Sequence, residues 1–197
     1  MTALPKLAPS RMTVAEFLDW PGDRSGRKFE LADGEARAMA PASATHGRIQ
    51  ATVARLLGNH LAGTGCSAVI EPGVVPRVRA EANMRVPDVA VTCEADASGV
   101  HAMAEPILIV EVLSPSNEPE TRENVWAYAT IPTVREILLI RSTSLAAELI
   151  RREPDGTWPA TAISICEHDW LSLESLGFSC ALMALYEGTR FYRVDEG

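Results

Sequence analysis

The chain has 197 residues, of which 47% are hydrophobic and 22% are charged, a composition typical of one globular domain. The net charge of −8 argues against a broad phosphate-binding surface, because non-specific affinity for nucleic acid depends on many basic contacts. No run of about 18 apolar residues occurs and the N-terminus lacks a signal-peptide core, so we expect a cytoplasmic protein without a membrane partner.

The N-terminal part of the chain predicts a loose arm over residues 1–12, followed by a short helix and a hairpin. Thr13 with Glu16 three residues later has the pattern of a capping box, and the Pro-Gly pair at 21–22 would stop the helix. The segments "KFELA" and "EARAMA" flank the Asp-Gly pair at 33–34, which favours a tight turn between two strands.

Residues 44–62 form the clearest predicted helix. Ser43 or Thr45 can cap its start, and Gly63 can end it. One apolar stripe runs along it at helical spacing, formed by Ile49, Val53, Leu56, Leu57 and Leu61.

The rest of the chain alternates between predicted strands and a second helix. Strands are expected near 66–71, 86–91 and 107–113, a helix over 118–130, and three more strands in "VREILLIRS", "LAAELIRREP" and "PATAISI". The C-terminal "FSCALMALYEG" fits either a strand or a helix. The fold class predicted is therefore mixed α/β, with one domain over 1–197, a central mixed sheet flanked by helices, and an N-terminal helix-hairpin extension.

Four cysteines lie far apart in the chain, and none forms a CxxC pair. This spacing excludes a common zinc motif, and a disulfide framework is not expected in a chain of this size. We therefore predict buried, reduced thiols at Cys66, Cys93, Cys166 and Cys180.

Two acidic residues interrupt strands that are otherwise apolar. Glu111 lies on the same face of its predicted strand as Ile109 and Leu113, and Asp88 shares a face with Val86 and Ala90 on the preceding predicted strand. If the two strands are antiparallel neighbours in register, the carboxylates of Asp88 and Glu111 meet and repel unless a proton or a cation separates them. Oxygen ligands favour Mg²⁺, Mn²⁺ or Ca²⁺, so a shared metal is one interpretation.

The alternative is that these acids only bond to a turn amide or pair with Arg85 or Arg135. Other candidates also have two interpretations. His46 and Gln50 share one face near the start of their helix, so His46 either faces the site or lies on the helix surface. Arg77, Arg79 and Arg85 either contact a phosphate backbone or form a solvated strand face, and Trp126 is expected on the core face of its helix.

The motifs "VPDVAV", "LIVEVLSPS", "VWAY" and "IPTVREILLI", in this order, resemble those of the Uma family of restriction-endonuclease-like proteins in the PD-(D/E)XK nuclease superfamily. The N-terminal "MTVAEFLDW" and "KFELADGEARAMAPAS" also fit this family, so the resemblance spans nearly the whole chain. It implies a restriction-endonuclease-like core in which a helix, three antiparallel strands, a second helix and a further strand follow one another.

The resemblance also implies a site and a reaction. Asp88 would be the acid of the "PD" motif, Glu111 the second acid, and Glu30 a third. Asp88 and Glu111 would hold Mg²⁺ or Mn²⁺, which binds the scissile phosphate and lowers the pKa of the attacking water. For Glu30 the alternative is a surface strand residue beside a turn.

The sequence departs from the superfamily at its usual lysine. Leu113 stands two residues after Glu111, where the lysine is normally found, and Asn124 stands where many Uma sequences carry a lysine on the following helix. The chain has only two lysines, Lys6 in the arm and Lys28 in the first hairpin, and neither is expected to help. Asn124 could hold a water, and Arg122 could bring charge but not act as a base.

Two hypotheses follow. The first is a divalent-metal-dependent endonuclease that hydrolyses phosphodiester bonds in DNA, with Glu30, Asp88, Glu111 and Asn124 at its catalytic site. The second is a catalytically degenerate nuclease fold that acts as a binding or regulatory domain, which the missing lysine and the acidic net charge favour. A homo-oligomer is expected if a strand edge is exposed.

Overall fold

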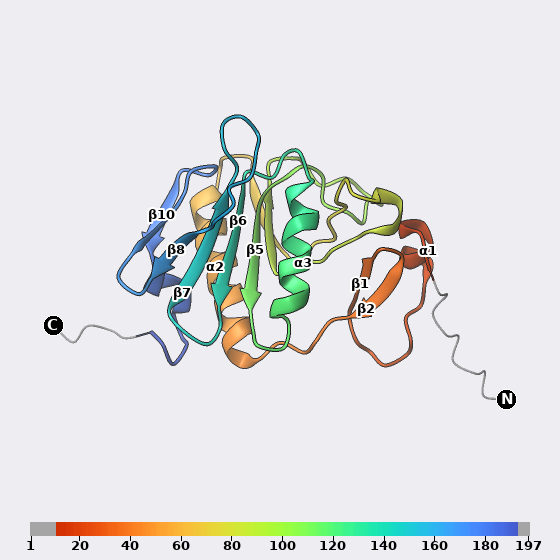
Figure 1. Ribbon diagram of the computed structural model, residues 1–197, viewed down its shortest axis with the longest axis horizontal. Coiled ribbons are helices and arrows are strands. Elements are labelled where there is room, and N and C mark those ends of the chain that lie inside the picture. Colours follow the sequence, from red (N-terminus) through yellow and green to blue (C-terminus); the bar gives the residue numbers. More distant parts are fainter. Residues whose placement is uncertain (1–10, 193–197) are drawn as a thin grey trace.

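The computed structural model describes residues 11–192 and builds them around a six-stranded sheet with a helix on each face (Figure 1). Along the sheet the strands follow the order β3-β4-β5-β6-β7-β8. Their bounds are β3 Ser67–Ile70, β4 Val89–Thr92, β5 Pro106–Leu113, β6 Glu136–Arg141, β7 Ala146–Arg151 and β8 Ile163–Cys166. Only the β5–β6 pair is parallel; the other neighbours are antiparallel.

The two main helices are α2 (Ala44–Leu61) and α3 (Glu118–Ala129). With β3, β4, β5 and β6 they give the predicted order of helix, three antiparallel strands, helix and strand. The prediction of a mixed α/β fold with a restriction-endonuclease-like core is therefore confirmed. Of the two predicted caps, Ser43 is the one that caps α2, and it accepts a hydrogen bond from the His46 amide at 3.2 Å.

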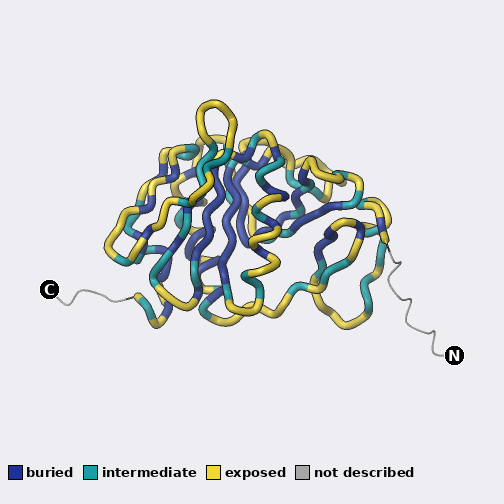
Figure 2. Tube along the Cα trace, viewed as in Figure 1, coloured by how far each residue is buried: buried dark blue, intermediate teal, exposed yellow. Residues whose placement is uncertain are grey.

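Each helix covers its own apolar core, and the central strands between them are buried along most of their length (Figure 2). Under α2, the predicted stripe of Ile49, Val53 and Leu57 packs on Val89, Val91, Leu108, Val110 and Val112. Under α3, Tyr128 packs on Ala90, Ile109 and Leu113 from the opposite face. The side chains that alternate along β4 and β5 therefore divide between the two cores, and this division decides which face receives the acids.

A smaller unit lies beside α3 and is built from α1 (Val14–Asp19) and the hairpin of β1 (Phe29–Ala32) and β2 (Glu35–Ala38) (Figure 1). The capping box of Thr13 and Glu16 forms as predicted. Gly34 completes the hairpin turn at φ +85°, where a Cβ would lie 3.3 Å from Arg11 and Met12.

The prediction of a loose arm over residues 1–12 is wrong for Met12, and most of the arm lies outside the described residues. Met12 is buried, its amide donates to the Gly34 carbonyl at 2.7 Å, and its side chain joins Leu31 and Met84 in a small core. Residues 1–10, including Lys6, are not described.

The C-terminal segment that fitted either a strand or a helix contains both kinds of structure. Strand β10 (Phe178–Ala181) pairs with β9 (Trp170–Leu173), and a 3₁₀ helix follows over Leu182–Tyr186. A second 3₁₀ helix, Ala80–Ala82, connects β3 to β4. The β9–β10 hairpin packs Leu171, Leu173 and Phe178 into the core under α2.

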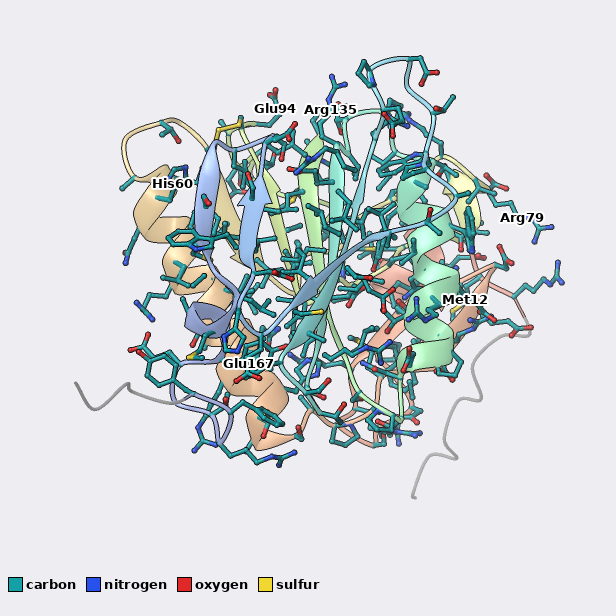
Figure 3. The ribbon with its side chains drawn as sticks, turned by 60° about the vertical axis from the view of Figure 1, so that its left-hand side comes forward. Met12, His60, Arg79, Glu94, Arg135 and Glu167 are labelled. Carbon is teal, nitrogen blue, oxygen red and sulfur yellow. A yellow bond between two sulfur atoms is a disulfide. The ribbon has the colours of Figure 1, made fainter. Side chains whose placement is uncertain are left out.

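The prediction of four reduced thiols is wrong for two of them, because Cys66 and Cys93 form a disulfide. It is the yellow bond beside the labelled Glu94 (Figure 3). Ser67 and Thr92 are paired residues of β3 and β4, so the cysteines one position further out lie opposite each other across the antiparallel pair. The spacing of 27 residues gave no local sign of this pairing. Cys166 and Cys180 are free, but Cys166 is exposed and Cys180 is half-buried, so the prediction that the thiols are buried is wrong as well.

Trp126 was predicted on the core face of its helix, and this is also wrong, because the residue is 74% exposed. The buried face of α3 consists of Thr121, Asn124, Ala127 and Tyr128. Three of these four residues carry a polar group, so hydrophobicity alone pointed to the wrong side of the helix.

Strands β3 and β8 form the two edges of the central sheet, and both are largely exposed. Homo-oligomer formation through these edges stays a prediction. Within residues 11–192, no helix combines the length and the apolar character needed to cross a membrane.

Candidate active site

A cavity of about 460 Å³ opens where the ends of β4 and β5 meet the start of α2, the start of α3 and the N-terminal hairpin. All four residues predicted at the catalytic site line this cavity: Glu30, Asp88, Glu111 and Asn124. The structure therefore brings together side chains that are up to 94 residues apart in the sequence.

Strand pairing explains why Asp88 and Glu111 meet. Val89 pairs with Val110 in the antiparallel β4–β5 ladder, so the residue before Val89 faces the residue after Val110. The amide of Val112 donates a 2.6 Å hydrogen bond to the Asp88 carboxylate. The prediction that the two strands are antiparallel neighbours in register is confirmed, and the two acids are only 8% and 6% exposed.

Burial dominates the electrostatics of Glu111. Removal from water raises the pKa of its carboxyl well above the ordinary value of 4.5, and the nearby Asp88 carboxylate raises it further. The Tyr128 hydroxyl donates to Glu111 Oε1 at 2.7 Å and opposes part of this rise. Burial and the charge of Glu111 raise the pKa of Tyr128 as well, so this hydroxyl keeps its proton and remains a donor.

Asp88 is held by α2. His46 Nε2 lies 2.8 Å from Asp88 Oδ1, and the Gln50 side chain donates to the Asp88 backbone carbonyl at 3.0 Å. His46 is buried, so of its two interpretations the structure supports the one in which it faces the site, and a helix-surface histidine is wrong. The shared helix face of His46 and Gln50 is the feature that brings both to Asp88.

Glu30 reaches the cavity from β1, and its interpretation as a surface strand residue is wrong because it is buried. Arg85 Nη1 lies 3.4 Å from Glu30 Oε1, and Asn124 Nδ2 donates to Glu30 Oε2 at 3.1 Å. Burial raises the pKa of Glu30, and the charge of Arg85 opposes this rise. Arg85 is thus a buried partner of Glu30 and does not belong to a solvated basic strand face.

Sequence reasoning missed Glu71, which also lines the cavity. Its amide donates to the Asp88 carbonyl at 3.1 Å, and its backbone adopts φ +50°, an uncommon conformation for a residue other than glycine. The Glu71 carboxylate is paired with Lys28, which lowers its pKa, and accepts a 3.5 Å contact from Gln50. The β3–β4 register places it there, since the residue after Ile70 faces the residue before Val89, and the sequence carried no local sign of that register.

The expected substitutes for the missing lysine need correction. Arg122 pairs with Glu118 and Glu148 and is not among the residues that line the cavity. Lys28, which was expected to lie out of reach in the hairpin, does line it. Leu113 is 2% exposed in the core under α3, so an apolar core side chain occupies the position where the superfamily usually has a lysine.

Among residues 11–192, no three His, Cys, Asp or Glu side chains are arranged to hold a metal ion in their present conformations. The donor set nevertheless fits a hard divalent cation, because Asp88, Glu111 and Asn124 all offer oxygen atoms to one cavity. The side-chain oxygen of Asn124 is buried and has no hydrogen-bond partner in the described structure. Buried polar atoms usually have a partner, so this oxygen is free to take a ligand.

The fold and the acidic cavity define a restriction-endonuclease-like α/β protein. The model of the Uma2 family, described as "Putative restriction endonuclease", matches residues 14–183, and the chain belongs to this family. The sequence resemblance to the Uma family is thereby confirmed. Restriction-endonuclease-like families in general use divalent cations.

One relative and one solved structure are similar to this chain. An uncharacterized protein of Synechocystis sp. is 34% identical over 189 residues, which cover 95% of each chain. The crystal structure of a protein from Anabaena variabilis, described as "a putative nuclease belonging to DUF820", superposes with a TM-score of 0.72 at 15% identity. The match covers 89% of this chain and 97% of that one, and at this identity it supports the fold alone.

Proposed function

We propose that this protein is a divalent-metal-dependent nuclease that hydrolyses phosphodiester bonds in DNA, with Asp88 and Glu111 as ligands of Mg²⁺ or Mn²⁺. The observation that carries the proposal is the convergence of these two buried carboxylates in one cavity. Ionised Glu111 is unfavourable because it is buried and lies beside the Asp88 carboxylate, and a cation bound between the two acids would offset this unfavourable free energy.

When bound, the cation would polarise the scissile phosphate and lower the pKa of an attacking water. The protein residues would fix the ligands. His46 and the Val112 amide orient Asp88, and Tyr128 orients Glu111. Asn124 joins Glu30 to the same wall and offers a buried oxygen to a water or to the cation.

A second function has a specific observation in its favour. Neither Leu113, which is packed in the core, nor Asn124, which is uncharged, replaces the positive charge of the usual lysine. A degenerate nuclease fold that binds metal or nucleic acid without turnover is therefore the alternative proposal.

One experiment separates the two proposals. Mn²⁺ binding is measured by calorimetry, and cleavage of fluorescent single- and double-stranded DNA is measured with Mg²⁺ or Mn²⁺. We expect Asp88→Asn and Glu111→Gln to abolish cleavage and weaken Mn²⁺ binding, whereas Glu148→Gln, an acid outside the cavity, changes neither. Metal binding without cleavage in the wild type supports the degenerate fold. Cleavage that survives both cavity substitutions contradicts the nuclease site proposed for this chain.

A further inference from the structure

The cavity is strongly acidic, and a phosphate group needs positive charge to enter it. Glu30, Glu71, Asp88, Glu111 and Glu120 all line its wall. A bound cation offsets part of this charge, but nucleases of this superfamily normally add a lysine, which is absent from both expected positions. Any further cation must therefore come from another part of the fold.

Three lysine or arginine side chains line the cavity, and all come from the N-terminal extension: Arg27, Lys28 and Arg37. Arg27 pairs with Asp23 at 2.8 Å, and Arg37 pairs with Glu123 at 3.0 Å. Neither of these acids lines the cavity, so the guanidinium groups of both arginines are held by partners outside it.

Lys28 differs because its partner belongs to the site. Its ammonium group pairs with Glu71, and the Glu71 amide is bonded to the Asp88 backbone. Gln50 contacts both the Glu71 carboxylate and the Asp88 carbonyl. Through this network Lys28 is held on the side of the cavity where Asp88 lies.

Lys28 can leave Glu71 for another anion with little loss of free energy. The Lys28 side chain is 67% exposed, and an ion pair of this exposure contributes little to stability. A lysine ammonium on its flexible four-carbon stem can turn from one anion to another without moving the backbone. A phosphate in the cavity would offer it a doubly or singly charged partner in place of the Glu71 carboxylate.

We infer that Lys28 is the phosphate-binding cation of this cavity, and that it exchanges Glu71 for a phosphate oxygen when a nucleotide unit of the substrate enters. The inference rests on the proposed function, because it assigns the role of the missing superfamily lysine to a residue of the first hairpin. The ligand class is a phosphate ester of a nucleotide.

The small number of lysines gives a direct test. Reductive methylation with ¹³C-formaldehyde, which keeps the lysine charge, labels only Lys6, Lys28 and the terminal amine. Thymidine 5′-monophosphate is then titrated in by NMR, with and without Mg²⁺, and Lys28→Arg assigns the Lys28 signal by removing it. We expect the Lys28 signal to shift saturably as the nucleotide is added.

Binding of the same nucleotide to unlabelled protein is measured by calorimetry. Lys28→Ala should weaken it at least about tenfold, Lys28→Arg by less than about threefold, and Arg55→Ala not at all, because Arg55 pairs with Glu187 away from the cavity. An unchanged affinity in Lys28→Ala, a static Lys28 signal, or no binding of the nucleotide overturns the inference.

Cleavage and Mn²⁺ affinity separate this inference from the proposed function. Lys28→Ala should retain wild-type Mn²⁺ affinity, which Glu111→Gln should not. If the wild type cleaves DNA and Lys28→Ala cleaves it with an equal kcat/KM, the role of Lys28 is wrong and the nuclease proposal stands. If the wild type does not cleave but binds the nucleotide through Lys28, the nuclease proposal fails and the Lys28 site stands.

Discussion

Replacing Glu111 with glutamine should stabilise the metal-free protein at neutral pH, and the gain should disappear as the pH falls towards 4.5. Glutamine has nearly the shape of glutamate, and its side-chain oxygen can still accept the 2.7 Å hydrogen bond from Tyr128. The substitution therefore removes the ionisable carboxyl group and keeps the packing and the acceptor.

The magnitude follows from proton linkage. Burial and Asp88 raise the folded-state pKa of Glu111 well above the ordinary value of 4.5 expected in the unfolded chain. Between these two values the folded state keeps a proton that the unfolded state has lost. The free energy of unfolding of the wild type then falls by up to about 1.4 kcal/mol for each pH unit. Glu111→Gln lacks this contribution, so the gap between the two proteins should widen steadily, by up to about 1.4 kcal/mol for each pH unit, as the pH rises above 4.5.

The assay is urea unfolding followed by tryptophan fluorescence, in EDTA, from pH 5 to pH 8. A gap of 1 kcal/mol corresponds to about 2–4 °C in Tm for a chain of this size, so thermal scans provide a second measurement. Saturating Mn²⁺ should stabilise the wild type and reverse the order of the two proteins, since only the carboxylate can bind the cation strongly. A gap that is independent of pH, or a metal-free Glu111→Gln that is less stable than the wild type, would refute the argument.

Three further predictions concern other parts of the molecule. Without reductant the unfolded protein should show two reactive thiols, rising to four after reduction, and four thiols at the outset would contradict the disulfide. The double substitution Cys66→Ser with Cys93→Ser should lower the free energy of unfolding by about 3–4 kcal/mol, because the bridge closes a loop between residues 27 positions apart. Asn124→Lys should raise the cleavage rate about tenfold or more by placing a cation beside Glu30, and an unchanged rate would mean that charge does not limit the reaction. Arg85→Met should cost about 3–5 kcal/mol in urea unfolding by leaving Glu30 buried without its ion pair, and adding Glu30→Gln should recover most of this loss.

Local patterns in the chain determined most of the architecture. The capping box at Thr13, the turn at Gly34 and the apolar stripe of α2 depend on residues within a few positions of one another, and all three form as predicted. The strand alternation that placed Asp88 and Glu111 on one face is local as well, and it sufficed to bring them into one cavity once the two strands paired.

Features that depend on register or on distant partners could not be obtained in this way. The Cys66–Cys93 bridge and the position of Glu71 both follow from which residues of β3 and β4 lie opposite each other. A one-residue slip in this register would separate the cysteines, and no local propensity fixes it. The prediction for Trp126 was wrong because polar residues of α3 form its buried face, where they line a polar cavity. That cavity is formed only where the N-terminal hairpin packs beside α3.

The sequence alone therefore determined that Asp88 and Glu111 belong to two neighbouring apolar segments, that the usual lysine is missing, and that the chain has the element order of its family. The tertiary structure alone decided how those acids are held, because the partners of Asp88 and Glu111 come from α2 and α3. It also decided that Lys28 reaches the cavity. Hydrogen bonds and ion pairs at such sites depend on distances of a few ångströms between residues tens of positions apart, and only the packing of the helices and the hairpin on the sheet fixes these distances.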